Sequence, residues 1–247
     1  MKLNKLMQLR KDNARAEGPA AIRMDATATD AHVYINDVID SFWGASAASL
    51  INAMAGHADK TVHMHINSPG GDVFEARAMA AIVVAHPGKV VAHIDGICAS
   101  AATYLALACS EVRMTDGGLF MVHNSWTMAY GNKSELRTTA DLLDKIDGTI
   151  AADYMRKTGA SAEQVSTWMD ATTWFTAAEA LAAKFIDAID PNSKQTGPQD
   201  AAQARWNLAA YPNAPTQPEK LPEPDLTALA AQQTQLNRNR LRLLTPI

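Results

Sequence analysis

Ser100 and His123 are two residues whose types and surroundings suit acyl-transfer chemistry. Ser100 follows an apolar stretch and Gly96, and it opens a run of small residues that should form a helix. At the first turn of a helix a hydroxyl projects outward, and the helix dipole favours negative charge that develops there. His123 ends a strand-like run, and its imidazole titrates near neutral pH. A serine with such a base is the minimum for a nucleophilic hydrolase.

Residues 67–72, with the sequence NSPGGD, add a possible oxyanion site. Gly70 and Gly71 lie where a strand should give way to a helix, so their backbone N–H groups are used by neither element. Each feature alone has a common structural explanation: a helix cap for the serine, an ordinary polar residue for the histidine, and a turn for Ser-Pro-Gly-Gly. Their combination favours a catalytic site.

The elements that must position these residues alternate between strands and helices. The expected strands are residues 32–35, 61–67, 89–95, 111–114 and 119–123. The expected helices include residues 42–55, 72–86 and 133–158. This order predicts an α/β fold of right-handed βαβ units on a mainly parallel sheet.

Four stretches, INSPGGDVFEA, DGICASAATYLALA, MVHNSW and ATTWFTAAEALAAKFIDAI, resemble the proteolytic subunit of the Clp protease. The resemblance spans roughly residues 33–190 and is closer still to the Clp-like head maturation proteases of phages. It implies a Clp/crotonase-like spiral of βαβ units with Ser100 as nucleophile and His123 as general base. It also implies an oxyanion hole formed by the backbone N–H groups of Gly71 and Ala101.

The sequence does not decide which residue would orient His123 as the third member of a catalytic triad. In the cellular Clp subunit an aspartate orients the histidine, and the matching position here is Thr172, with Asp170 as the nearest carboxylate. A threonine can fix a histidine tautomer but does little for the imidazolium that forms, so a slower enzyme is expected. Asp170 and Thr172 are both candidates.

Proline placement divides the chain. We expect an N-terminal arm at residues 1–26, a Clp-like protease domain at 27–190, a Pro-rich linker at 191–224 and a helical tail at 225–247. The tail carries leucines on one helical face and arginines near its end, so it either docks on a partner or is a solvent-exposed helix.

Composition excludes several classes of protein. The chain has 247 residues, is 47% hydrophobic and carries a net charge of -4, which gives no basic excess for nucleic acid. No apolar run is long enough to span a membrane, and two cysteines are too few for a disulfide framework, so a cytoplasmic protein is expected. No cofactor or nucleotide-binding loop is expected. His63 and His65 share a strand face but lack a third ligand, so no metal site is expected.

The resemblance implies a self-assembling, ring-forming serine endopeptidase for head maturation in a phage or prophage, which cleaves scaffold and capsid proteins in the host cytoplasm or the procapsid. It needs no ATP by itself. The alternatives are an acyl-CoA enzyme of the crotonase superfamily and an inactive assembly module of the same fold. Residues 126–132 resemble the strand that lines the peptide groove in Clp subunits, and an ordinary amphipathic strand is the alternative.

Overall fold

The computed structural model describes residues 5–13, 22–191 and 206–215. Their strands form one eight-stranded sheet in the order β1-β2-β3-β4-β5-β8, from which β6 and β7 extend beside β4. The strands are β1 (Arg23–Ala26), β2 (Asp30–Ile35), β3 (Thr61–Ser68), β4 (Val90–Ala99), β5 (Glu111–Thr115), β6 (Leu119–Val122), β7 (Thr173–Thr176) and β8 (Ala188–Asp190). Most neighbours run parallel, and the pairs β1–β2 and β6–β7 are antiparallel. The expected α/β fold is confirmed.

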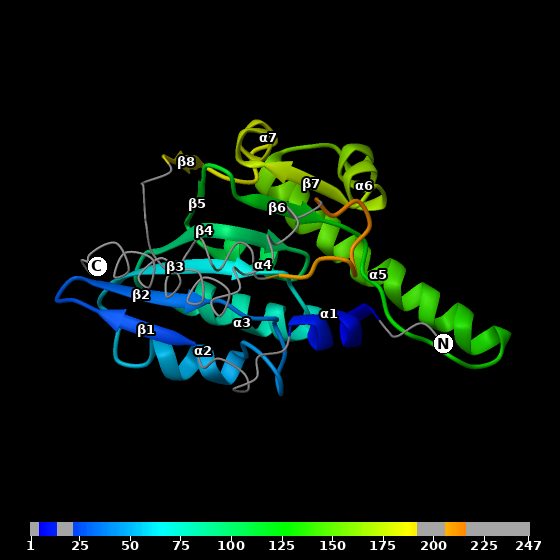
Figure 1. Cartoon of the computed structure of the whole chain (residues 1–247), viewed down its shortest axis with the longest axis horizontal. Helices are drawn as coiled ribbons and strands as arrows, with labels where there is room; N and C mark the ends of the chain where they lie inside the picture. Colours follow the sequence, from blue (N-terminus) through cyan, green and yellow to red (C-terminus); the bar gives the residue numbers. More distant parts are fainter. Residues whose placement is uncertain (1–4, 14–21, 192–205, 216–247) are drawn as a thin grey trace, which may run out of the picture. The chain divides into compact units, whose positions relative to one another are not determined.

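The helices of the described residues connect these strands. They are α1 (Lys5–Asn13), α2 (Ala47–Met54), α3 (Val73–Ala85), α4 (Ala102–Ala108), α5 (Lys133–Thr158), α6 (Ala162–Asp170) and α7 (Ala177–Ala182). Helices α2, α3 and α4 pack beside one another against one face of the sheet (Figure 1). None of the helices in these residues is long and apolar enough to cross a bilayer.

Strand β4 changes partners along its length, and this change sets up the site. Its first half pairs with β5, and its second half pairs with β6 from Ile97 to Ala99. Because β4 and β6 run parallel there, their carboxyl ends lie side by side. Ligand sites of open parallel sheets lie at such ends, and Ser100 and His123 are the residues that follow them.

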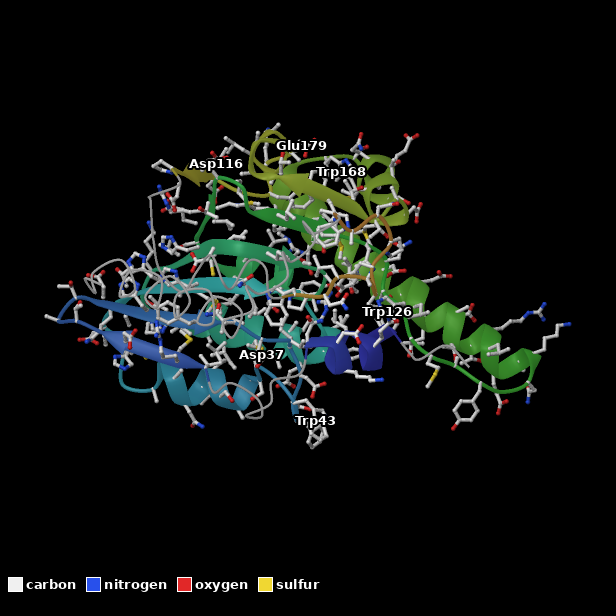
Figure 2. All side chains as sticks on the ribbon, viewed as in Figure 1. Asp37, Trp43, Asp116, Trp126, Trp168 and Glu179 are labelled. Carbon is white, nitrogen blue, oxygen red and sulfur yellow. The ribbon has the colours of Figure 1, made fainter. Side chains whose placement is uncertain are left out.

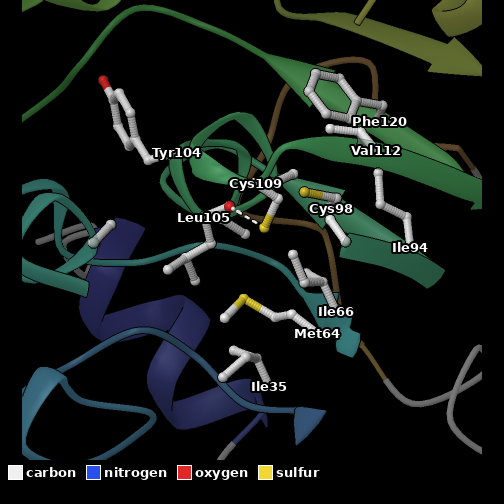
Figure 3. Packing of buried hydrophobic residues seen from close by; sticks show 14 of the residues in the cluster. Ile35, Met64, Ile66, Ile94, Cys98, Tyr104, Leu105, Cys109, Val112 and Phe120 are labelled. Atoms are coloured by element: carbon white, nitrogen blue, oxygen red, sulfur yellow. Dashed lines mark hydrogen bonds between the residues drawn. The ribbon is translucent and has the colours of Figure 1, made fainter. Parts of the chain in front are cut away.

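Alternation along the strands separates the core from the open face of the sheet. Met64 and Ile66 of β3 point into the core together with Ile94 of β4 and Leu105 of α4 (Figure 3).

The thiol of Cys109 donates to Leu105 O at 3.2 Å, and burial raises the pKa of this thiol to about 12. A thiol buried in this way is a packing group rather than a nucleophile.

Helix α2 begins later than the sequence predicts. Residues 42–46 precede the helix, since the carboxylate of Asp40 accepts backbone N–H bonds from Phe42 and Trp43 and holds a turn. Ser46 is the actual N-cap. Trp43 projects away from the ribbon and is 68% exposed (Figure 2). The expected helical start at residue 42 was therefore wrong.

The long helix α5 has the expected bounds, Lys133–Thr158. Asn132 and Glu135 form a capping box at its start, and Gly159 ends it with a φ of 73°. The stretch before it is different from what the sequence predicts, because residues 123–130 contain no strand. The backbone N–H of Ser125 instead donates to Asp147 of α5 at 2.6 Å. The expected strand over residues 126–132 was wrong.

Residues 206–214 pack against the sheet, although the sequence placed them in the Pro-rich linker. Trp206, Leu208 and Tyr211 are buried, and they form a second apolar cluster with Leu9 of α1. A segment with this many large apolar side chains stabilises the fold by burying them. The helical tail expected at residues 225–247 lies outside the described residues.

Candidate active site

Ser100 lies in a tight turn between β4 and α4. Its φ is 54°, in the left-handed region that residues with a side chain seldom adopt. The Ser100 N–H donates to Met121 O at 2.9 Å, which ties the turn to β6. A backbone of this kind persists only where its surroundings hold it, and such positions cluster at functional sites.

His123 follows β6 and faces Ser100 directly. The distance between Ser100 Oγ and His123 Nε2 is 2.7 Å, and the pair is partly buried. This distance fits a hydrogen bond in which the hydroxyl donates to the imidazole. The structure therefore brings together the two side chains that the sequence singled out, in the geometry that a serine and its base require.

The two glycines lie so close to neighbouring backbone that no side chain fits, Gly70 against the Ser100 turn and Gly71 against Ile39. A Cβ on Gly70 would lie 2.5 Å from Ala99 O and 2.8 Å from Ser100 Cβ. A Cβ on Gly71 would lie 2.1 Å from Ile39 O. Sterics thus explain both glycines, and each also has a positive φ, of 89° for Gly70 and 154° for Gly71.

Two backbone N–H groups beside Ser100 are candidates for an oxyanion hole. Ile39 bridges to the glycine loop through Gly70 O and the N–H of Asp72, so this bridge does not use the Gly71 N–H. Ala101 stands at the N-terminal end of α4, where N–H groups have no partner within the helix. Donors at such positions can stabilise a developing oxyanion.

The register of β6 and β7 places Thr172 near His123. Val122 and Thr173 form the last pair of this antiparallel ladder, and His123 and Thr172 are the residues that adjoin that pair. Thr172 has a φ of 51°, a second left-handed residue beside the site. Thr172 is therefore a candidate for the residue that orients the imidazole.

Asp170 is engaged elsewhere. Its carboxylate accepts from Asn124 Nδ2 at 2.7 Å and from Ser166 Oγ at 3.3 Å. It is exposed at the end of α6. Asp170 therefore reaches the neighbour of His123 and ties α6 to the chain that follows β6.

Tyr211 reaches the site from far along the chain, and it is not among the site residues expected from the sequence. Its Oη donates to Pro69 O at 2.5 Å, and its ring stands edge-on to the His123 imidazole with 5.4 Å between centroids. Burial raises the pKa of the Tyr211 phenol, and the nearby Ser100 side chain opposes this rise. The available signal was the pattern WNLAAY at residues 206–211, whose apolar residues are unusual for a linker.

A second polar cluster lies on the open face of the sheet and is called the histidine ladder below. It consists of His32, His63, His65 and His93 on β2, β3 and β4. Ring nitrogens of His63 and His93 are 2.9 Å apart, and those of His32 and His65 are 3.1 Å apart. Among the described residues no group of three or more His, Cys, Asp or Glu side chains could hold a metal ion.

Comparisons with known proteins find similarity to Clp proteases. The family model described as Clp protease matches residues 20–193. Over 156 residues the chain is 28% identical to the ATP-dependent Clp protease proteolytic subunit 1 of Leifsonia xyli subsp. xyli, which covers 62% of this chain and 79% of that protein. It is also 28% identical over 160 residues to proteolytic subunit 2 of Thermobifida fusca, covering 63% and 78%. With subunit 1 of Mycobacterium bovis the identity is 25% over 156 residues, covering 62% and 78%.

Proposed function

Since this chain belongs to the Clp protease family, we propose that it is a serine endopeptidase with Ser100 as its nucleophile and His123 as its general base. The observation that carries this proposal is the 2.7 Å contact between Ser100 Oγ and His123 Nε2. The hydroxyl sits on a turn that the fold holds in a sparsely populated backbone conformation.

The proposed reaction proceeds by acyl transfer. His123 Nε2 takes the proton of Ser100 Oγ as the oxygen attacks a peptide carbonyl, and the N–H groups of Gly71 and Ala101 donate to the oxyanion. The imidazolium then gives its proton to the leaving amine, which frees the first product. Water attacks the acyl-enzyme with His123 again as base, and Ser100 regains its proton when the second product leaves.

We assign the orienting position beside His123 to Thr172 rather than Asp170. The strand register supports Thr172, and the hydrogen bonds of Asp170 to Asn124 and Ser166 support a different task for that carboxylate. A hydroxyl supplies geometry without a full charge, so the imidazolium is stabilised less than in an enzyme with an aspartate. Slow turnover suits a protease that acts once per assembly.

We further propose head maturation in a phage or prophage, with scaffold and capsid polypeptides as substrates in the host cytoplasm or procapsid. The resemblance of the catalytic motifs supports this role, as does the threonine at a position where the cellular subunit has an aspartate. Chemistry at Ser100 consumes no ATP. Co-expression with capsid and scaffold proteins tests the role: wild type should process them, Ser100→Ala should not, and processing by that variant would overturn the assignment.

We also propose that the chain assembles into a ring of its own copies, as the Clp family resemblance implies. Helix α5 supports this, because Leu136 and Leu142 on it are 44% and 53% exposed. Apolar side chains on an extended helix are stabilised when another subunit covers them. Sedimentation of the full chain should show an oligomer at micromolar concentration, and a monomer would contradict assembly.

A further inference from the structure

Residues 206–214 cross the edge of the sheet at which the catalytic pair lies. Trp206, at the start of this segment, donates from Nε1 to Asn67 Oδ1 at 3.1 Å. Near its end, Trp174 Nε1 donates to Pro212 O at 3.3 Å, and Asn213 Nδ2 donates to Ala171 O at 3.0 Å. The segment therefore runs from the end of β3, past Ser100, to the turn between α6 and β7. It is called the strap below.

The strap covers the apolar surface next to the nucleophile. Trp206, Leu208, Ala210 and Tyr211 form one buried cluster with residues of β4, β6 and α1. The members on the strands include Ile97, Ala99 and Met121. Ala99 precedes Ser100, and Met121 O accepts the Ser100 N–H. Any substrate side chain that binds beside Ser100 on this surface must displace the strap.

Tyr211 is the strap residue closest to the chemistry. Its Oη donates to the carbonyl of Pro69, in the loop that carries the Gly71 N–H, and its ring edge meets His123 at an interplanar angle of 84°. The residue is 6% exposed. One side chain thus contacts both the base and the loop that carries the Gly71 N–H, beside the pair formed by Ser100 and His123.

A second contact fastens the strap from the other end of the chain. Asn13, at the end of α1, donates from Nδ2 to Asn207 O at 3.0 Å, and its Oδ1 accepts the Asn207 N–H at 2.6 Å. Asn13 is 7% exposed, so both bonds are shielded from water. Neither α1 nor the strap lies within residues 20–193, which the Clp protease family model matches. The two segments are an addition to the family's core that closes over the site.

We propose that the strap is an intramolecular inhibitor, in which Tyr211 occupies the place of a substrate residue and keeps the peptidase inactive until the strap is displaced. This inference rests on the proposed function, because it needs Ser100 to be the nucleophile. The Tyr211 side chain also indicates the kind of substrate. A polypeptide with a large aromatic side chain next to the scissile bond would fit the space that Tyr211 leaves when the strap is displaced. The strap contributes no strand to the sheet, so its displacement breaks no strand pairing.

The test compares the full-length wild type with Tyr211→Ala and Trp206→Ala. Tyr34→Ala is the matched control, since Tyr34 stacks on His65 on the open face of the sheet. Two rates are measured, labelling of Ser100 by a fluorophosphonate and hydrolysis of a fluorogenic peptide with an aromatic residue before the scissile bond. A strap that is closed nine times in ten would give about a tenfold rise in both rates when it is lost. Tyr34→Ala should match wild type.

The nine-residue peptide WNLAAYPNA, identical to the strap, gives an independent arm that does not depend on the folding of one variant. Added to Tyr211→Ala, it should lower both rates, whereas the same peptide with alanine in place of tyrosine should not. Tyr211→Phe keeps the packing but loses the bond to Pro69 O, so it should show a smaller rise than Tyr211→Ala.

The outcomes separate the two proposals. Labelling of Ser100 at one rate in wild type and in all strap variants would overturn the inhibitor and leave the protease intact. A fall in both rates for folded Tyr211→Phe would also overturn it, because Tyr211 would then assist catalysis. If Ser100 is labelled in no variant, the proposed function itself fails.

Discussion

The catalytic corner around Ser100 and the histidine ladder are two polar clusters on one sheet, and they are built in opposite ways. Ser100 lies in a turn with a positive φ and His123 just beyond a strand end, beside glycines that no side chain can replace. The ladder histidines occupy regular strand positions and hydrogen-bond with one another and with Asp95. The difference indicates that reactive positions lie where regular hydrogen bonding stops and backbone donors become available.

Removal of either member of the catalytic pair should have the largest effect. Ser100→Ala should abolish peptide hydrolysis, and His123→Ala should cost on the order of 10⁴-fold or more in kcat, since the Ser100 hydroxyl then has no base to take its proton. His65→Gln, in the ladder, should stay within a few fold of wild type. Initial rates on one fluorogenic peptide check all three, and a large loss for His65→Gln would erase the distinction between the clusters.

The glycine loop should be the next most sensitive part. Gly70→Ala places a Cβ 2.5 Å from Ala99 O, so the loop must move away from Ser100, and a shift of about 1 Å costs about a hundredfold in rate. Gly148→Ala in α5 is the matched control, because a Cβ there meets nothing within 4 Å. The kinetics of both variants, with thermal melts to verify folding, check this. Equal rates for the two variants would mean that the loop is not part of the site.

The residue that orients His123 should have a smaller effect. Thr172→Val should lower kcat about tenfold to a hundredfold, as loss of an orienting hydrogen bond does, whereas Asp170→Asn keeps a group that can bond with Asn124 and should cost little. The reverse ranking would make Asp170 the third member. If both variants stay close to wild type, the enzyme works as a Ser-His dyad. The pH dependence of kcat for each variant distinguishes orientation from general destabilisation.

The ladder should have the smallest effect, on stability rather than on rate. Burial and the charges of neighbouring histidines lower the pKa of His93 and of His32 below the ordinary value, and Asp190 and Asp30 act against this. A lowered pKa in the folded state means that folding favours the neutral ring, so stability is present above the ordinary histidine pKa and is lost as pH falls below it. Urea unfolding between pH 8 and pH 5 should show this loss, and His93→Gln should reduce it. A midpoint that rises on acidification would contradict the account.

Short-range sequence patterns were enough to predict most of the strands and helices and the two central residues of the candidate site. Strand alternation and the Gly-Gly turn are short-range signals, and they predicted β3, the helix after Asp72 and the positions of Ser100 and His123. The features that these patterns did not predict depend on contacts between residues far apart in the sequence. Asp40 holds residues 42 and 43 in a turn, so the helix expected from residue 42 begins later. Asp147 of α5 accepts the N–H of Ser125, which precedes the strand expected at residues 126–132.

The strap is a further feature that short sequence patterns could not predict, because its position depends on contacts with distant segments. Prolines at residues 212 and 215 made this stretch look like a linker, whereas the burial of Trp206 and Tyr211 depends on a surface assembled from β4, β6 and α1. No short window of sequence contains that surface. Our proposal of Thr172 over Asp170 likewise rests on the register of β6 and β7, which residues distant in the sequence set.

The central claim is that Ser100 is a nucleophile activated by His123, and mapping a covalent adduct tests it most directly. The full-length protein is treated with a fluorophosphonate, digested and analysed by mass spectrometry beside His123→Ala and His65→Gln. We expect one adduct, on Ser100, in wild type and His65→Gln, and none in His123→Ala over the same time. An adduct on another residue, or equal labelling of Ser100 without His123, would contradict the account.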